Sequence, residues 1–448
     1  MAQENTLLSA PETQRSLASR PTLVAAGAAK SSAGARESWL RRLGRRLVIG
    51  KLARITAGRL TVVESGERRH FGTRGTFPLE GTVVVHDSAF WERVAWGGSI
   101  GAGEAYCDGL WSTPDLTTVV RILARNQEVL QVMDSGIGSL AAPLHRFLHR
   151  QRTNTKSGSI RNIAAHYDTG NEFFSTFLDA TLTYSCAIFP DALSTLETAQ
   201  EWKLDTICTK LGLDPDDHLL EIGTGWGGLA IHAARKYGCR VTTTTISQQQ
   251  FSYASRAVAE ADLEDRITVL QADYRDLPAA VNERFDKLAS IEMIEAVGHR
   301  YLPTYFDVID RMLKPDGLVL LQAITIPDQR YETYRRSVDF IQHYIFPGAI
   351  LPSMARIQEC VKKRTDLRLV DVEDLTPHYA RTLKAWSDRF ETREDEIAAL
   401  GLSEAERKKW KYYFGYCEGG FLERTIGNVH MLFGKPLNRR DVQPGRLV

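Results

Sequence analysis

The feature that most constrains the fold of this chain is a regular alternation of short apolar runs with longer helical stretches, starting near residue 160. Seven of these runs have the length and texture of strands. They are HLLEIG (218–223), RVTTTTIS (240–247), ITVLQAD (267–273), FDKLASIEMI (285–294), GLVLLQAITI (317–326), DLRLVDV (366–372) and NVHMLFG (428–434). Repeated β-α-β units predict an α/β fold with a doubly wound, mainly parallel sheet of about seven strands.

The first of these strands runs into a glycine-rich loop, LLEIGTGWGG (219–228). Gly223, Gly225 and Gly228 fit the dinucleotide fingerprint G-x-G-x-x-G. With Glu221 and Gly227, the same loop also fits E-x-G-x-G-x-G, the first loop of S-adenosylmethionine enzymes. A dinucleotide site needs an acidic residue about 20 positions later, and no carboxylate lies between Gly223 and Glu260. The loop therefore favours S-adenosylmethionine, with Glu221 placed to face a cationic ligand.

Composition excludes several classes of protein. The 448 residues carry a formal net charge of +1, which gives no global attraction to nucleic acid. The six cysteines have no C-x-x-C spacing, which argues against a metal site or a disulfide framework and for a reducing compartment. No apolar run approaches the ~20 residues of a membrane-spanning helix. We therefore expect a cytoplasmic protein without a metal.

The part of the chain before residue 160 predicts several smaller units. Residues 1–35 are poor in large apolar side chains and predict a disordered tail. Residues 36–55 form a basic amphipathic segment, which fits either a helix that binds an anionic membrane surface or an ordinary helix packed on the next domain. Residues 56–148, with a hairpin signal at Ser65-Gly66, predict a small α+β domain with a connecting helix. A polar linker (149–159), the catalytic domain (160–436) and a tail (437–448) complete the chain.

Three further segments resemble one family of enzymes. They are HYDTGNEFFSTFLDATLTYSCAIF (166–189), SIEMIEAVGHRYLPTYF (290–306) and GYCEGGFLERTIGNVHMLF (415–433). Together with the glycine loop, they resemble the cyclopropane-fatty-acyl-phospholipid synthases, a family that includes the mycolic-acid cyclopropane synthases. The resemblance implies a Rossmann-like S-adenosylmethionine methyltransferase domain from about residue 160 onward. The stretch 59–125, including GAGEAYCDGLW (101–111), resembles the small N-terminal domain of the phospholipid-acting branch.

The resemblance also implies an activity and a binding site. The enzyme would transfer the methyl carbon of S-adenosylmethionine to a cis double bond in a membrane phospholipid and close a cyclopropane ring through a carbocation. A T-x-S-x-x-Q pattern replaces the usual ribose-binding acid, and Thr245, Ser247 and Gln250 fit it. The implied cofactor contacts are Tyr184, Ser185, Gly223, Gly225, Thr245, Ile246 and Gln250, with Asp273 and Tyr274 near the adenine.

The base that removes a proton from the transferred methyl group would, by resemblance, be a bound bicarbonate ion. Cys186, Glu295 and Tyr379 would hold this ion. The family's His-x-Ile pair corresponds here to Gln322 and Ile324, and a glutamine cannot titrate. Because the chemistry needs no thiolate, we expect Cys186 to line the site rather than to act as a nucleophile.

Other functions stay open at this point. The Gln322 difference makes a fatty-acyl C-methyltransferase with a methylene- or methyl-branched product a live alternative. A non-catalytic lipid-binding protein of the same fold is a second alternative, and a small-molecule N-methyltransferase is a weaker third. The family further suggests a homodimer that associates peripherally with the inner face of the membrane.

Overall fold

The computed structural model describes residues 38–75, 78–127, 154–156, 158–159, 161–162 and 170–439. The predicted tail 1–35, most of the linker 149–159 and the end of the C-terminal tail lie outside the described residues. The described residues from Trp39 onward belong to one compact unit. Among them, no helix has the length and apolar character that crossing a bilayer requires.

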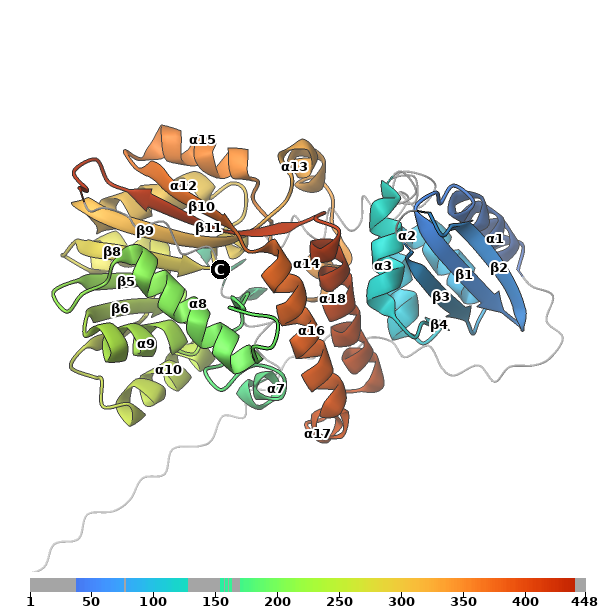
Figure 1. The fold of residues 1–448 in the computed structure, drawn as a ribbon, viewed down its shortest axis with the longest axis horizontal. Helices are drawn as coiled ribbons and strands as arrows, with labels where there is room; N and C mark the ends of the chain where they lie inside the picture. Colours follow the sequence, from blue (N-terminus) through green and yellow to red (C-terminus); the bar gives the residue numbers. More distant parts are fainter. Residues whose placement is uncertain are drawn as a thin grey trace, which may run out of the picture. The chain divides into compact units, whose positions relative to one another are not determined.

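A seven-stranded sheet forms the centre of the larger part of this unit (Figure 1). Its strand order is β10-β11-β9-β8-β5-β6-β7, and only β11 runs antiparallel to its neighbours. The strands are β5 (His218–Ile222), β6 (Arg240–Thr245), β7 (Ile267–Gln271), β8 (Phe285–Ile291), β9 (Leu313–Thr325), β10 (Arg368–Asp374) and β11 (Gly427–Gly434). The doubly wound α/β fold is therefore confirmed.

Helices cover both faces of this sheet, so its central strands are buried on both sides. One core lies under α8 (Leu196–Leu211), α9 (Gly228–Tyr237) and α10 (Gln248–Glu260). The other core lies under α12 (Leu302–Met312) and α15 (Met354–Arg364), and Figure 1 shows the two groups on opposite sides. Parallel strands covered in this way place their carboxyl ends at one edge, where ligands bind in such folds.

Further helices complete the larger part of this unit. They are α7 (Asn171–Ser175), η2 (Tyr274–Asp276), α11 (Leu277–Ala280), η3 (Ile294–Ala296), α13 (Asp328–Tyr334), α14 (Phe340–Tyr344), α16 (Thr376–Thr392), α17 (Glu394–Ala399) and α18 (Glu404–Leu422). Helices α16 and α18 lie side by side (Figure 1). Phe177, Trp386 and Phe414 are among the aromatic residues that fill the space between α7, α16 and α18.

The smaller part has a four-stranded sheet of order β2-β1-β3-β4. Its elements are α1 (Trp39–Leu52), β1 (Gly58–Glu64), β2 (Glu67–Thr73), β3 (Glu80–Val85), α2 (Ala89–Cys107), β4 (Trp111–Ser112) and α3 (Leu116–Arg125). Ser65 and Gly66 both have positive φ, as the tight turn of the predicted hairpin requires.

Helix α3 packs closely against α18. A Cβ added to Gly419 would lie 2.7 Å from Cγ1 of Val120, so only a glycine permits this approach. Glu423, just after α18, accepts a hydrogen bond from Arg121 at 2.7 Å and another from Arg125 at 2.6 Å. The N-terminal elements are thus joined to the helix that also borders the site described next.

Candidate active site

The glycine loop connects β5 to α9 with backbone angles that favour glycine. Gly223, Gly225 and Gly227 have φ of 110°, 53° and 92°. A Cβ at Gly223 would lie 3.3 Å from Cγ of Met293. The turn therefore brings the start of α9 and its free amide groups close to the carboxyl end of β5, which suits a bound nucleoside.

Two buried charged groups lie beside this loop. Glu221 accepts a hydrogen bond from the Thr243 hydroxyl at 2.6 Å, and burial raises the pKa of its carboxyl to about 8. Lys203 donates to the Ser185 hydroxyl at 2.8 Å, and burial lowers the pKa of its ammonium group to about 8. A cationic ligand beside Glu221 would favour the charged carboxylate, which agrees with the role predicted for this residue.

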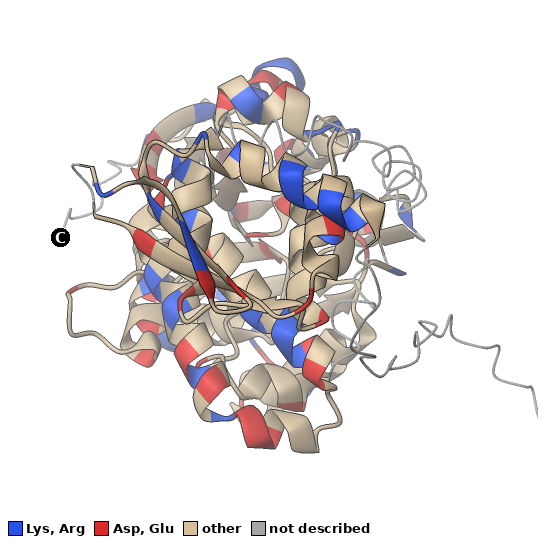
Figure 2. Cartoon of the chain, turned by 90° about the vertical axis from the view of Figure 1, so that its right-hand side faces the viewer, with Lys and Arg blue, Asp and Glu red and all other residues tan. Residues whose placement is uncertain are grey.

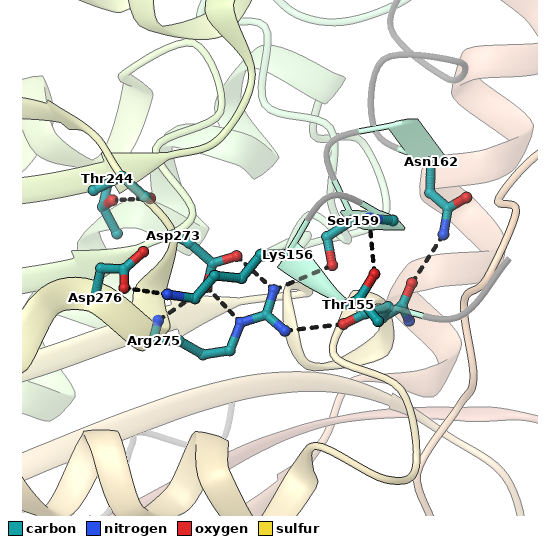
Figure 3. Close-up of polar contacts among 11 residues, drawn as sticks. Thr155, Lys156, Ser159, Asn162, Thr244, Asp273, Arg275 and Asp276 are labelled. Atoms are coloured by element: carbon teal, nitrogen blue, oxygen red, sulfur yellow. Dashed lines mark hydrogen bonds and ion pairs between the residues drawn. The ribbon is translucent and has the colours of Figure 1, made fainter.

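Further polar contacts lie at the end of β6 and just after β7. Thr245 donates to the side-chain oxygen of Gln250 at 2.9 Å, which fixes the first turn of α10. Asp273 does not face the site with a free carboxylate, because both of its oxygens accept hydrogen bonds from Arg275 (Figure 3). Arg275 also donates to the Ser159 hydroxyl at 3.4 Å, so it ties the described part of 154–162 to this edge.

One cavity of about 910 Å³ joins these groups. Thirteen of the sixteen predicted site residues line it: Tyr184, Ser185, Glu221, Gly223, Gly225, Thr245, Ile246, Gln250, Asp273, Tyr274, Glu295, Ile324 and Tyr379. Gly227, Cys186 and Gln322 are not among the lining residues. The Tyr274 hydroxyl is buried without a hydrogen-bond partner among the described residues. The glycine turn, the buried acid and this orphaned hydroxyl fit an S-adenosylmethionine molecule, whose sulfonium would supply the methyl group.

Glu292, a residue that the sequence did not single out, lies where several predicted residues meet. Its Oε1 accepts hydrogen bonds from the Cys186 backbone amide at 3.0 Å, from Gln322 at 2.7 Å and from Asn428 at 2.7 Å. Its Oε2 accepts one from the Tyr379 hydroxyl at 2.7 Å. The Cys186 amide and the Tyr379 hydroxyl, which were predicted to hold bicarbonate, therefore bind a side chain of the protein itself.

Glu295 lies close to Glu292 and lines the same cavity. Its Oε1 accepts a hydrogen bond from the Ile324 backbone amide at 2.5 Å, and its predicted role in holding an ion stays a prediction. Its Oε2 is buried and has no hydrogen-bond partner among the described residues. Burial, together with the nearby charge of Glu292, raises the pKa of Glu295 to about 8. At neutral pH this carboxyl is mostly protonated and can donate a hydrogen bond into the cavity.

The orientation of Gln322 follows from its neighbours. Its amide nitrogen donates to Glu292 and, at 3.3 Å, to the Cys186 carbonyl. Its oxygen faces Nε2 of His430 at 2.9 Å and must accept a hydrogen there. Burial lowers the pKa of His430 well below its usual value, so the ring is neutral. Gln322 therefore links a buried histidine to the Glu292 carboxylate without itself titrating.

Cys186 is a poor candidate for a nucleophile in this setting. Its side chain is buried, and its thiol donates to the Ala187 carbonyl at 3.2 Å. Burial raises the pKa of the thiol well above its usual value, because a thiolate would lose its hydration. Cys186 does not line the cavity itself, and its backbone amide reaches the site through its hydrogen bond to Glu292.

The sequence contained a usable signal for some of the missed residues. Glu292 directly follows β8, at the carboxyl edge of a parallel sheet, inside a segment that had already been recognised. Asn428 and His430 alternate along β11 and so face the same side. Lys203 gave no such signal, since a lysine on a helix normally lies at the surface.

The fold and this site define an S-adenosylmethionine-dependent methyltransferase. A family model described as mycolic acid cyclopropane synthetase matches residues 154–431, which is more than half of the chain. The chain therefore belongs to that family and is an enzyme of the cyclopropane synthase type, which confirms the resemblance seen in the sequence.

Individual relatives extend the match beyond the catalytic part. Tuberculostearic acid methyltransferase UfaA1 of Mycobacterium tuberculosis is 38% identical over 352 residues, covering 77% of this chain and 81% of that protein. The cyclopropane-fatty-acyl-phospholipid synthase of Escherichia coli strain K12 is 35% identical over 373 residues, covering 82% of this chain and 91% of that protein. The solved structure of mycolic acid cyclopropane synthase CmaA1 complexed with SAH and CTAB has a TM-score of 0.57 and 34% identity, covering 62% of this chain and 98% of that one.

Proposed function

We propose that this enzyme transfers the methyl carbon of S-adenosylmethionine to a cis double bond in an unsaturated acyl chain of a membrane phospholipid. The observation that carries the proposal is the shared cavity. It is lined by the glycine loop with Glu221 and also by apolar residues of α3 and α18, among them Val120, Leu123 and Phe421. A methyl donor and an acyl chain could thus occupy one continuous cavity.

The cavity also suits a cationic intermediate. Aromatic rings of Tyr184, Phe346, Tyr379, Tyr413 and Phe421 line it, and their faces attract positive charge. The rings of Tyr379 and Phe421 stack with centroids 4.4 Å apart, which holds both in place. Enclosure by these side chains would keep water away from a carbocation that water would otherwise capture.

Two products are compatible with this first step. Ring closure gives a cyclopropane, the product in the name of the Escherichia coli relative. A hydride shift onto the cationic carbon, followed by loss of a methyl proton, gives a methylene-branched chain. A saturated methyl branch needs in addition a separate hydride-donating reductant. The name of the Mycobacterium tuberculosis relative and the presence of Gln322 in place of a histidine favour a branched product as the second candidate.

The decisive experiment supplies purified enzyme with methyl-labelled S-adenosylmethionine and vesicles of a cis-unsaturated phospholipid. We expect label in the acyl chain, and none with a saturated phospholipid of the same head group. Proton NMR of the product then distinguishes a cyclopropane, whose ring protons resonate at high field, from an isomeric methylene chain. Absence of label in the unsaturated lipid would contradict the proposed function.

Access to a bilayer would come through α1. Val48 and Leu52 of this helix are buried against the domain, which agrees with the packed-helix interpretation. The other face of α1 exposes Trp39, Arg42 and Arg46, which are about one helical turn apart. This face can contact an anionic surface while the opposite face stays packed on the domain. Figure 2 is drawn from the side of the smaller sheet and shows basic segments in blue on this part of the chain.

Charge reversal tests this contact without removing the packed face of α1. Arg42→Glu together with Arg46→Glu should weaken binding to anionic vesicles by about tenfold or more, since each basic residue near such a surface contributes ~1 kcal/mol. Arg256→Glu together with Arg284→Glu, at exposed positions elsewhere, is the matched control. Equal vesicle binding by the two double variants in a sedimentation assay would remove the membrane role of α1.

A further inference from the structure

We propose that Glu292 is the base that removes the proton from the transferred methyl group, in place of a bound bicarbonate ion. This inference rests on the proposed function, because it names the base of the same reaction. It concerns a side chain to which the sequence gave no role, and it makes the enzyme independent of dissolved bicarbonate.

The first support is the set of donors around the carboxylate. Three N–H groups, from Cys186, Gln322 and Asn428, converge on Oε1, and the Tyr379 hydroxyl donates to Oε2. The donors come from the segment before α8 and from β9, β11 and α16. Four converging donors are what an anion needs when it is removed from water, and here the protein supplies the anion itself.

The second support is the capacity that remains on Oε2. A carboxylate has about four lone-pair positions, two on each oxygen. The three hydrogen bonds on Oε1 use its full capacity, whereas Oε2 accepts one hydrogen bond and keeps one position. Glu292 lines the cavity together with Glu221, Tyr184 and Glu295. Oε2 can therefore accept a proton from a group bound in that cavity, while the donors on Oε1 hold the carboxylate in place.

The third support is that the site disfavours a second anion. Bicarbonate presents the same planar O–C–O group as a carboxylate, so it would need the donors that Glu292 occupies. It would also lie against the negative charge of Glu292 and beside the carboxyl of Glu295. Burial weakens screening, so this repulsion would be substantial.

The backbone gives an independent observation. Glu292 has φ of 50°, a left-handed conformation that non-glycine residues rarely adopt. Its amide nevertheless donates to the Gln322 carbonyl at 2.9 Å, so the surrounding strands hold it in this conformation. Unfavourable backbone angles of this kind persist mainly where the side chain has to reach a functional position.

The reaction balances with this base. The π electrons of the alkene form a bond to the donated methyl carbon, while the electrons of the broken carbon–sulfur bond remain on sulfur and leave S-adenosylhomocysteine. The other alkene carbon becomes a cation. Oε2 of Glu292 takes one proton from the former methyl group, and the electrons of that C–H bond close the ring onto the cationic carbon. For a methylene product, a hydride first shifts from the methyl-bearing carbon to the cationic carbon, and the electrons of the methyl C–H bond then form the double bond to the former methyl carbon. The neutral carboxylic acid then returns the proton to water after product release.

The first test compares the wild-type enzyme with Glu292→Gln in buffer freed of carbon dioxide. The wild type should keep its rate of lipid methylation when bicarbonate is absent. The variant should lose about 10²–10⁴-fold in kcat, the usual contribution of a general base, and keep its affinity for S-adenosylmethionine by calorimetry. Glu283→Gln, a carboxylate outside the cavity, should keep the wild-type rate.

The second test uses Glu292→Gly, which the positive φ tolerates and which opens the anion position. Added bicarbonate or formate should restore activity at least tenfold in this variant and leave Glu292→Gln unchanged. As a readout independent of turnover, ¹³C-bicarbonate should show line broadening with Glu292→Gly and none with the wild type.

The possible failures are distinguishable. A wild-type rate that falls more than tenfold without bicarbonate, or ¹³C-bicarbonate binding to the wild type, would overturn the role of Glu292 and leave the proposed function intact. A Glu292→Gly variant that binds S-adenosylmethionine but is not rescued would also overturn it. No methyl transfer by the wild type under any condition would instead refute the proposed function.

Discussion

At the scale of single residues, the site is governed by ionisable groups held away from water. Glu221, Glu292 and Glu295 are all placed in or beside one cavity, and burial raises the pKa of each carboxyl. Lys203 lies among them, and burial lowers its pKa. In such a setting a cationic ligand changes the protonation of its neighbours when it binds, because charge is costly without a partner.

This coupling predicts a pH-dependent preference for the methyl donor over its product. As pH rises through about 8, Glu221 loses its proton and Lys203 loses its charge, and both changes favour a sulfonium. The ratio of dissociation constants for S-adenosylhomocysteine and S-adenosylmethionine should therefore rise by about tenfold between pH 6.5 and 9. Both ligands share the amino-acid end, so the contribution of that end to binding cancels in this ratio.

Calorimetric titration at several pH values measures the effect, and Glu221→Gln should flatten the profile. A ratio that stays constant in the wild type, or a profile unchanged in Glu221→Gln, would show that the acid does not face the sulfonium. Glu221 lines the cavity beside the glycine turn, and its role toward the sulfonium stays a prediction.

At the scale of helices and strands, the sequence predicted what depends on local pattern. All seven strand candidates correspond to strands of the sheet, with ends that differ by a few residues. The largest difference is β9, which begins at Leu313 because the sheet continues through a Pro-Asp-Gly stretch that resembles a turn. An irregular register between β8 and β9 accommodates it.

Close helix packing could not be predicted in this way, and it leads to a paired prediction. Gly419 on α18 lies against Val120, so Gly419→Ala should destabilise the protein by about 1–3 kcal/mol through overpacking. Gly50 on α1 has no atom within 4 Å of an added Cβ, so Gly50→Ala should stabilise it by about 0.5–1 kcal/mol. Chemical denaturation measures both; a Gly419→Ala variant as stable as Gly50→Ala would show that α3 and α18 are not in close contact in solution.

At the scale of the whole molecule, the site depends on contacts between segments far apart in the sequence. The donors around Glu292 come from residues 186, 322, 379 and 428, and no local pattern relates these positions. The family resemblance indicated that several of them belong together, but it implied an ion at the point where this chain places its own carboxylate. Only the assembled fold could show that difference.

Glu423 is another residue whose effect depends on a contact between distant segments, because it joins the part with the seven-stranded sheet to the part with the four-stranded sheet. It holds Arg121 and Arg125 of α3, and residues of α3 and α18 line the apolar end of the cavity. Glu423→Ala should lower the unfolding free energy by about 1–3 kcal/mol, because it removes the carboxylate that two partly buried guanidinium groups share. It should also raise KM for the phospholipid while the affinity for S-adenosylmethionine stays unchanged, since the hydrogen-bond partners of Glu423 are on α3 and not in the glycine loop. Glu404→Ala, which removes an exposed pair with Lys408, is the matched control and should change neither quantity. If Glu423→Ala lowers stability but leaves KM for the lipid unchanged, the N-terminal elements support the fold without forming part of the acyl-binding site.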